Sequence, residues 1–156
     1  MYTMSNAPEN ELLAFSQDIK SGALAFEGAV STNGSGAILA NTLQEDLLAS
    51  QDSIIVAKGC VLSVNAGSNT IASFKIGSDG FTPTFVDTYP SNGVLPVSLT
   101  EYKCLVYVLN AGVDGSISGY DLNHRTCALS PIPGSTVTLK QSTGLGPEDP
   151  PAAASS

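Results

Sequence analysis

Short runs of alternating apolar and polar residues, separated by turns, make up most of the chain. Residues 105–109 form a β-branched and aromatic run, and residues 116–122 alternate with a period of two, which is typical of a strand with one buried face. A weaker run follows at 128–132, and residues 94–100 supply another short apolar segment between turns. These four segments predict a small antiparallel sheet.

The pattern occurs three times along the chain, with an Asn-Ala pair opening a turn at Asn6, Asn65 and Asn110. The first two copies stand 59 residues apart, and Asn33-Gly34 and Asn92-Gly93 keep the same spacing. The second and third copies stand 45 residues apart, so the first unit carries an excess of 14 residues. Asn and Gly suit such turns because both tolerate positive φ.

Four strands in a period of 40–50 residues are typical of propeller blades. We therefore predict an all-β chain: a partial β-propeller of about three four-stranded antiparallel blades. Its units are expected at about 1–50, 51–104 and 105–141, and together they form one domain.

Two segments fall outside this repeat. The excess of the first unit lies within 34–52, where residues 39–48 are the one candidate helix; we interpret them as a loop excursion with at most one helical turn. Residues 142–156 combine Gly, Pro, Ala and Ser without periodicity, so we expect a disordered C-terminal tail.

Composition excludes several classes of protein. The chain has 156 residues, of which 42% are hydrophobic and 13% charged, and this is too apolar for a disordered protein. Six Lys and Arg against 14 Asp and Glu give a net charge of −8, which argues against nucleic acid and anionic membranes as partners. No apolar run is long enough to span a bilayer, and residues 1–10 lack the regions of a secretory signal, but the compartment stays open.

The cysteines are Cys60, Cys104 and Cys127, without the spacing of a zinc site. Cys60 and Cys104 precede equivalent strands, and Cys104 and Cys127 are placed on the second and fourth strands of one sheet. Two strand spacings separate the latter pair by about 10 Å, beyond the reach of a disulfide. We expect three reduced, apolar core cysteines. The carboxylates are scattered and match no calcium loop, so no metal or other cofactor is expected.

Residues 63–74, 94–99 and 105–112 resemble the lactonase-type seven-bladed β-propeller family, which includes 6-phosphogluconolactonase-like and 3-carboxymuconate cyclase-like proteins. The resemblance covers about residues 2–139. It implies lactone hydrolysis or muconate lactonisation, with a small lactone or organic acid as ligand. Three units cannot make seven blades, so the chain looks like the N-terminal part of a propeller. We expect this isolated chain to be inactive and to self-associate through exposed blade faces.

Family sites use His, Arg and Glu around the central mouth of the propeller. The chain's only His and Arg are His124 and Arg125, on a hairpin tip that we expect to point away from the mouth, so no catalytic residue is assigned. On the mouth side, Asn33, Asn92 and Asp114 are the candidate ligand contacts. The competing interpretation is that such residues only cap local turns.

A second class of function also fits the sequence. The acidic composition and the Asn-rich turns suit a non-catalytic binding or cell-surface propeller. Asn33-Gly34-Ser35 is a glycosylation sequon, which matters only if the protein is exported.

Overall fold

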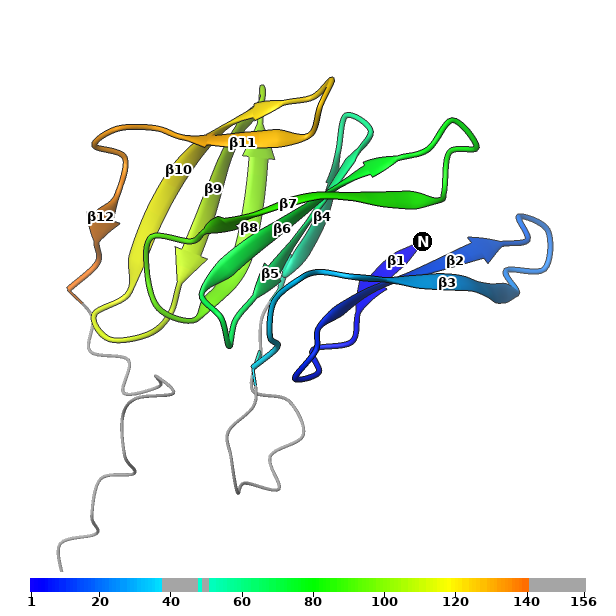
Figure 1. Ribbon diagram of the computed structural model, residues 1–156, viewed down its shortest axis with the longest axis horizontal. Helices are drawn as coiled ribbons and strands as arrows, with labels where there is room; N and C mark the ends of the chain where they lie inside the picture. The colour runs from blue at the N-terminus through cyan, green and yellow to red at the C-terminus, as the bar shows by residue number, and fades with distance from the viewer. Residues whose placement is uncertain (38–47, 49–50, 141–156) are drawn as a thin grey trace, which may run out of the picture.

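The computed structural model describes residues 1–37, 48 and 51–140, and its strands form three antiparallel sheets (Figure 1). The first sheet contains β1 (Tyr2–Met4), β2 (Glu11–Gln17) and β3 (Leu24–Ser31). The second contains β4 (Ile54–Ala57), β5 (Cys60–Asn65), β6 (Thr70–Ile76) and β7 (Pro83–Pro90). The third contains β8 (Pro96–Tyr102), β9 (Leu105–Asn110), β10 (Ser116–Asn123) and β11 (Ala128–Pro131), and β12 (Val137–Thr138) pairs with β10. The predicted all-β fold is confirmed.

The sheets stack in sequence order, and the middle sheet is covered on both faces. Every residue of β5 is buried, because alternate side chains face different neighbours. Val61 packs with Leu12 of the first sheet, whereas Leu62 packs in the core that contains Val106 of the third. Burial on two faces explains why β5 is an almost continuous apolar run.

Described residues cover only one face of each outer sheet. In β9, Val106 and Val108 are buried, whereas Tyr107 and Leu109 on the opposite face are 37% and 36% exposed. In β3 of the first sheet, Phe26 is 61% exposed. The stack therefore presents apolar side chains at both ends.

Residues 32–37, which follow β3, and the β7–β8 connection lie at one end of the strands, with the β5–β6 and β9–β10 turns (Figure 1). We call this the crossover end, and the end with the β4–β5, β8–β9 and β10–β11 turns the hairpin end. The third sheet begins at Pro96, so the expected unit boundary at 104/105 falls inside it. Most of the candidate helix at 39–48 and the tail at 142–156 lie outside the described residues.

No helix among the described residues is long and apolar enough to cross a membrane.

A glycine in each crossover packs directly against an asparagine of the next sheet. A Cβ added to Gly34 would lie 2.2 Å from Nδ2 of Asn65, and one added to Gly93 would lie 2.4 Å from Cγ of Asn110. Only a residue without a side chain fits so close to its neighbour. This contact explains the repeated Asn-Gly pairs, whose asparagines, Asn33 and Asn92, have φ of 52° and 57°.

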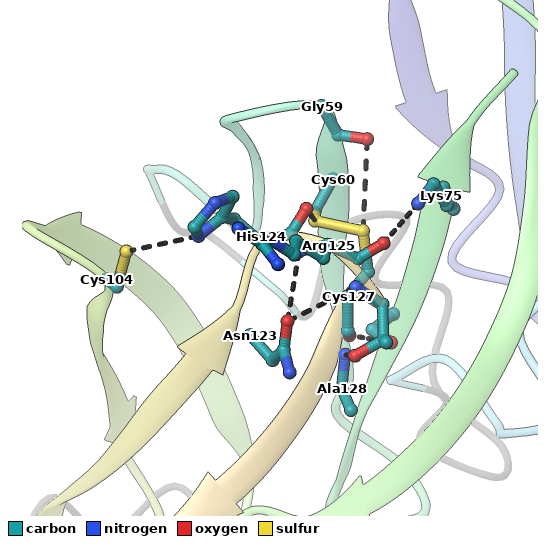
Figure 2. Close-up of a disulfide and its surroundings, with 11 residues drawn as sticks. Gly59, Cys60, Lys75, Cys104, Asn123, His124, Arg125, Cys127 and Ala128 are labelled. Carbon is teal, nitrogen blue, oxygen red and sulfur yellow. Dashed lines mark hydrogen bonds between the residues drawn. A yellow bond between two sulfur atoms is a disulfide. The ribbon is translucent and has the colours of Figure 1, made fainter. Parts of the chain in front are cut away.

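The expectation of three reduced cysteines is wrong. Cys60 and Cys127 form a disulfide with a Cα–Cα distance of 5.5 Å, and Cys104 is the free thiol (Figure 2). Cys60 begins β5 in the second sheet, and Cys127 lies in the β10–β11 turn of the third. Strand spacing within one sheet does not limit this pair, because the two cysteines belong to neighbouring sheets whose hairpin tips converge.

The disulfide connects residues 67 positions apart. In the chain-entropy view, closing a loop of that length stabilises the folded state by roughly 4 kcal/mol. It therefore fastens the second sheet to the third at the hairpin end.

Gly93→Ala should test the crossover contact. The new Cβ would overlap Asn110, so the free energy of unfolding should fall by about 1–3 kcal/mol in urea titration. Combining it with Asn110→Ala removes the overlap with the asparagine and leaves the one with Oγ of Ser116, which the new Cβ would meet at 2.5 Å. The double-mutant cycle should therefore show partial coupling. Strictly additive losses would contradict a direct contact.

Candidate functional site

The predicted ligand contacts all lie exposed at the crossover end. Asn33 follows β3, Asn92 follows β7, and Asp114 stands in the β9–β10 turn. The topology accounts for this placement, because crossovers and second-to-third-strand turns leave the same end of an antiparallel sheet.

Only two of these three residues share a hollow. Asn92 and Asp114 line an open depression of about 240 Å³ together with Val94, Val113 and Thr136. Asn33 lines a separate one of about 280 Å³, beside Pro8, Glu9 and Ser35. The structure thus brings Asn92 to Asp114 but leaves Asn33 with the first sheet.

The Asn92 side chain is held by a tyrosine that reaches it from the core. Its Nδ2 donates to Oη of Tyr120 at 2.9 Å, and that hydroxyl donates to the carbonyl of Pro90 at 2.5 Å. Tyr120 is 1% exposed, and burial raises its pKa to about 12. One amide N–H of Asn92 is therefore used in fixing the crossover.

Asn33 caps its own turn. Its Oδ1 accepts from Oγ of Ser31 at 3.3 Å, and its backbone N–H donates to the same Oγ at 3.1 Å. The left-handed backbone at Asn33 suits an asparagine in such a turn.

Asn65 and Asn110 are structural and occupy matching positions. Both are fully buried, and each Nδ2 donates to a carbonyl of the preceding crossover: Thr32 at 3.5 Å for Asn65, and Ser91 at 3.2 Å for Asn110. Each also donates to a hydroxyl at the start of the next strand, Thr70 and Ser116 respectively.

Asn6 does not share these surroundings, although its spacing matches. It has φ of 52°, and its Oδ1 accepts from the backbone N–H of Ala37 at 2.8 Å. The side chain beside Asn65 is instead that of Asn10, fully buried, whose Nδ2 donates to Oδ1 of Asn65 at 2.9 Å. Spacing could not find Asn10, because its counterpart 59 residues later, Asn69, bonds to Leu95 N–H instead.

Comparison with solved structures identifies the architecture. A Lactobacillus plantarum protein matches with a TM-score of 0.64 and 21% identity over 88% of this chain and 38% of its own. Proteins named "putative 6-phosphogluconolactonase" match from Bacteroides uniformis (TM-score 0.67, 16% identity, 91% of this chain, 38% of that one) and Bacteroides fragilis (0.62, 16%, 85% and 34%). The chain shares its fold with these solved structures and forms part of a β-propeller. No family model and no curated protein matches the sequence.

The chain spans less than two fifths of the length of these solved structures. At sequence identities of 16–21%, the similarity shows a shared fold. Its three sheets are consecutive blades, with β1 to β3 forming a three-stranded first blade.

The sole His and Arg stand at the other end of the blades. His124 and Arg125 form the β10–β11 tip, at the hairpin end, where Nδ1 of His124 lies 3.9 Å from Sγ of Cys104. Lys75 donates to the Arg125 carbonyl in the same region (Figure 2). Neither side chain reaches the hollow that holds Asp114.

The hollow beside Asn92 therefore offers hydrogen-bonding groups and the carboxylate of Asp114. Within the described part of the chain, no three His, Cys, Asp or Glu side chains gather as metal ligands. The arrangement can bind a polar ligand through amides and hydroxyls, but Asp114 has no imidazole or guanidinium beside it among the residues lining the hollow.

Tyr120→Phe should reveal the anchor of Asn92 through pH dependence. The folded pKa lies above the usual value of 10.0, so the hydroxyl is neutral in both states below pH 10 and its contribution is then complete. Between pH 10 and 12 the Tyr120 hydroxyl ionises only in the unfolded chain, so the free energy of unfolding of the parent protein falls. The variant should lose roughly 0.5–1.5 kcal/mol per hydrogen bond at pH 8, and its deficit relative to the parent should shrink as pH approaches 12. If urea titrations gave the same difference in unfolding free energy between parent and variant at every pH in that range, this role of Tyr120 would be excluded.

Proposed function

We propose that this chain supplies three consecutive blades of a lactonase-like propeller and does not turn over lactones in isolation. One observation carries the proposal: three blades span 34–38% of the solved propellers they match. A reaction at the central mouth depends on groups that converge there from around the ring.

The chemistry at the crossover end supports this inference. Lactone hydrolysis needs a base that positions water and a cation or oxyanion donor for the developing charge. Asp114 and the amide of Asn92 could take part in such a site. His124 and Arg125, the side chains best suited to complete it, stand at the hairpin end.

The apolar outer faces favour self-association of the isolated chain. Leu109 and Tyr107 on one face, and Phe26 on the other, are more than a third exposed. In a longer propeller, neighbouring blades would cover such faces, because repeat units stabilise one another by stacking. In the isolated chain, a second copy of the chain can cover these apolar faces instead.

A turnover assay combined with light scattering tests the proposal. The purified chain should show no saturable hydrolysis of 6-phosphogluconolactone and no lactonisation of 3-carboxymuconate, with rates equal to those of Asp114→Asn. Its mass should exceed 15.9 kDa, the mass of one chain. Saturable turnover that Asp114→Asn abolishes would refute inactivity, and a monomer at every concentration would refute self-association.

A non-catalytic binding propeller of an oxidising compartment is the second candidate. Two observations favour it: the Cys60–Cys127 disulfide, and the exposed position of Asn33 in its sequon. Disulfides persist mainly in exported proteins, where an accessible Asn-x-Ser can carry glycan.

Glycan analysis separates this candidate from an intracellular protein. Expressed through a eukaryotic secretory route, the chain should carry glycan at Asn33, and Asn33→Gln should lose it together with the mass shift on glycosidase treatment. A secreted, folded chain with an unoccupied Asn33 would count against the candidate.

A further inference from the structure

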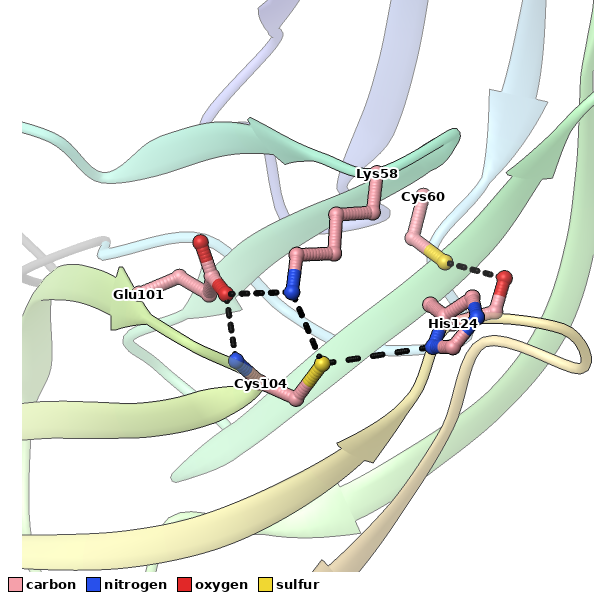
Figure 3. Close-up of polar contacts among 5 residues, drawn as sticks. All are labelled: Lys58, Cys60, Glu101, Cys104 and His124. Atoms are coloured by element: carbon pink, nitrogen blue, oxygen red, sulfur yellow. Dashed lines mark hydrogen bonds and ion pairs between the residues drawn. The ribbon is translucent and has the colours of Figure 1, made fainter.

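The hairpin end carries a group of reactive side chains that the proposed function does not use. Cys104 lies in the two-residue turn between β8 and β9, and its Sγ is 3.0 Å from Nζ of Lys58 and 3.9 Å from Nδ1 of His124 (Figure 3). Glu101 accepts a hydrogen bond from the Cys104 backbone N–H at 2.6 Å and lies 3.9 Å from Nζ of Lys58. Three separate hairpins thus place two basic side chains against one sulfur.

Cys104 occupies a backbone position at which the neighbouring blade has glycine. The β4–β5 turn is Lys58-Gly59 and the β8–β9 turn is Lys103-Cys104, so Gly59 and Cys104 correspond. Both have positive φ, 84° and 71°. A side chain is disfavoured in this left-handed region of the backbone, so the turn alone favours glycine. The contacts with Lys58 and Glu101 hold the cysteine there.

The three cysteines differ in access to solvent. Cys60 and Cys127 are 0% exposed and joined to each other, whereas Cys104 is partly exposed. A small reagent can therefore reach the thiol of Cys104 while the disulfide stays intact. An adjacent ammonium stabilises a thiolate, which is the nucleophilic form of cysteine.

We propose that Cys104 is a thiol-exchange site that takes up a small anionic thiol as a mixed disulfide. The Cys104 thiolate attacks one sulfur of a low-molecular-weight disulfide that carries carboxylates. The sulfur–sulfur bond of that disulfide breaks, a bond to Sγ of Cys104 forms, and the other half leaves as a thiolate, which takes up the proton lost from Cys104. The carboxylates suit the ammonium of Lys58 beside the sulfur. Lys103 shares the turn of Cys104, and Arg125 follows His124 in the β10–β11 turn.

The test uses the full chain without reductant and glutathione disulfide as the probe. Intact-mass measurement should show one glutathionyl adduct, absent in Cys104→Ser. Lys58→Met, which keeps the aliphatic stem, should slow the second-order rate roughly fivefold, the effect of one unit charge near 4 Å in water. Lys20→Met, in the β2–β3 hairpin of the first blade, should leave the rate unchanged.

A cationic probe distinguishes recognition of the anion from general thiol reactivity. With cystamine, Lys58→Met should slow the reaction less than it does with glutathione disulfide, because the lost charge no longer attracts the reagent. Added salt should bring the effects of Lys58→Met on the two reaction rates closer together, because it screens the charge of Lys58. Equal rates for the parent, Lys58→Met and Lys20→Met would overturn the proposal, as would adducts that persist in Cys104→Ser.

Discussion

Close contact between each crossover and an asparagine of the next blade sets how the blades stack. Gly34 lies against Asn65 and Gly93 against Asn110, and each asparagine donates to a crossover carbonyl on one side and a strand hydroxyl on the other. A buried amide in that position satisfies backbone groups that the crossover would otherwise leave without partners. The missing Cβ of glycine and the reach of asparagine therefore act together, and the apolar faces of neighbouring sheets meet as a consequence.

This arrangement also explains how the polar side chains of the crossover end are used. Its asparagines are used in making the fold: Asn65 and Asn110 inside it, Asn33 in its own turn, and Asn92 through the buried hydroxyl of Tyr120. The amide that lies beside Asp114 is thus oriented by the third blade's core, and the hollow keeps its shape because Tyr120 couples β10 to the crossover. A ligand there would meet a preformed set of donors and acceptors.

Local pattern predicted the strands and the repeat, because alternation and turn residues depend on neighbours in sequence. Local pattern could not predict which residues of neighbouring blades contact each other. The Cys60–Cys127 disulfide joins a strand start to a hairpin tip in the next blade, so distances within one sheet gave the wrong answer. The spacing of 44 between Cys60 and Cys104 concealed that Cys104 corresponds to Gly59, one position earlier in the turn. Likewise Asn6 matched Asn65 in spacing, whereas Asn10 makes the contact.

The two interfaces between blades are fastened unequally. Between the second and third blades, the disulfide acts at the hairpin end and the bond from Asn110 to Ser91 at the crossover end. Between the first and second blades, Asn10 and Asn65 are hydrogen-bonded at the crossover end. At the hairpin end, Oη of Tyr2 donates a hydrogen bond to the Phe81 carbonyl at 2.6 Å. A single exposed hydrogen bond is worth far less than a covalent bridge. Local opening should therefore begin where the first blade meets the second, while the second and third blades stay together as one unit.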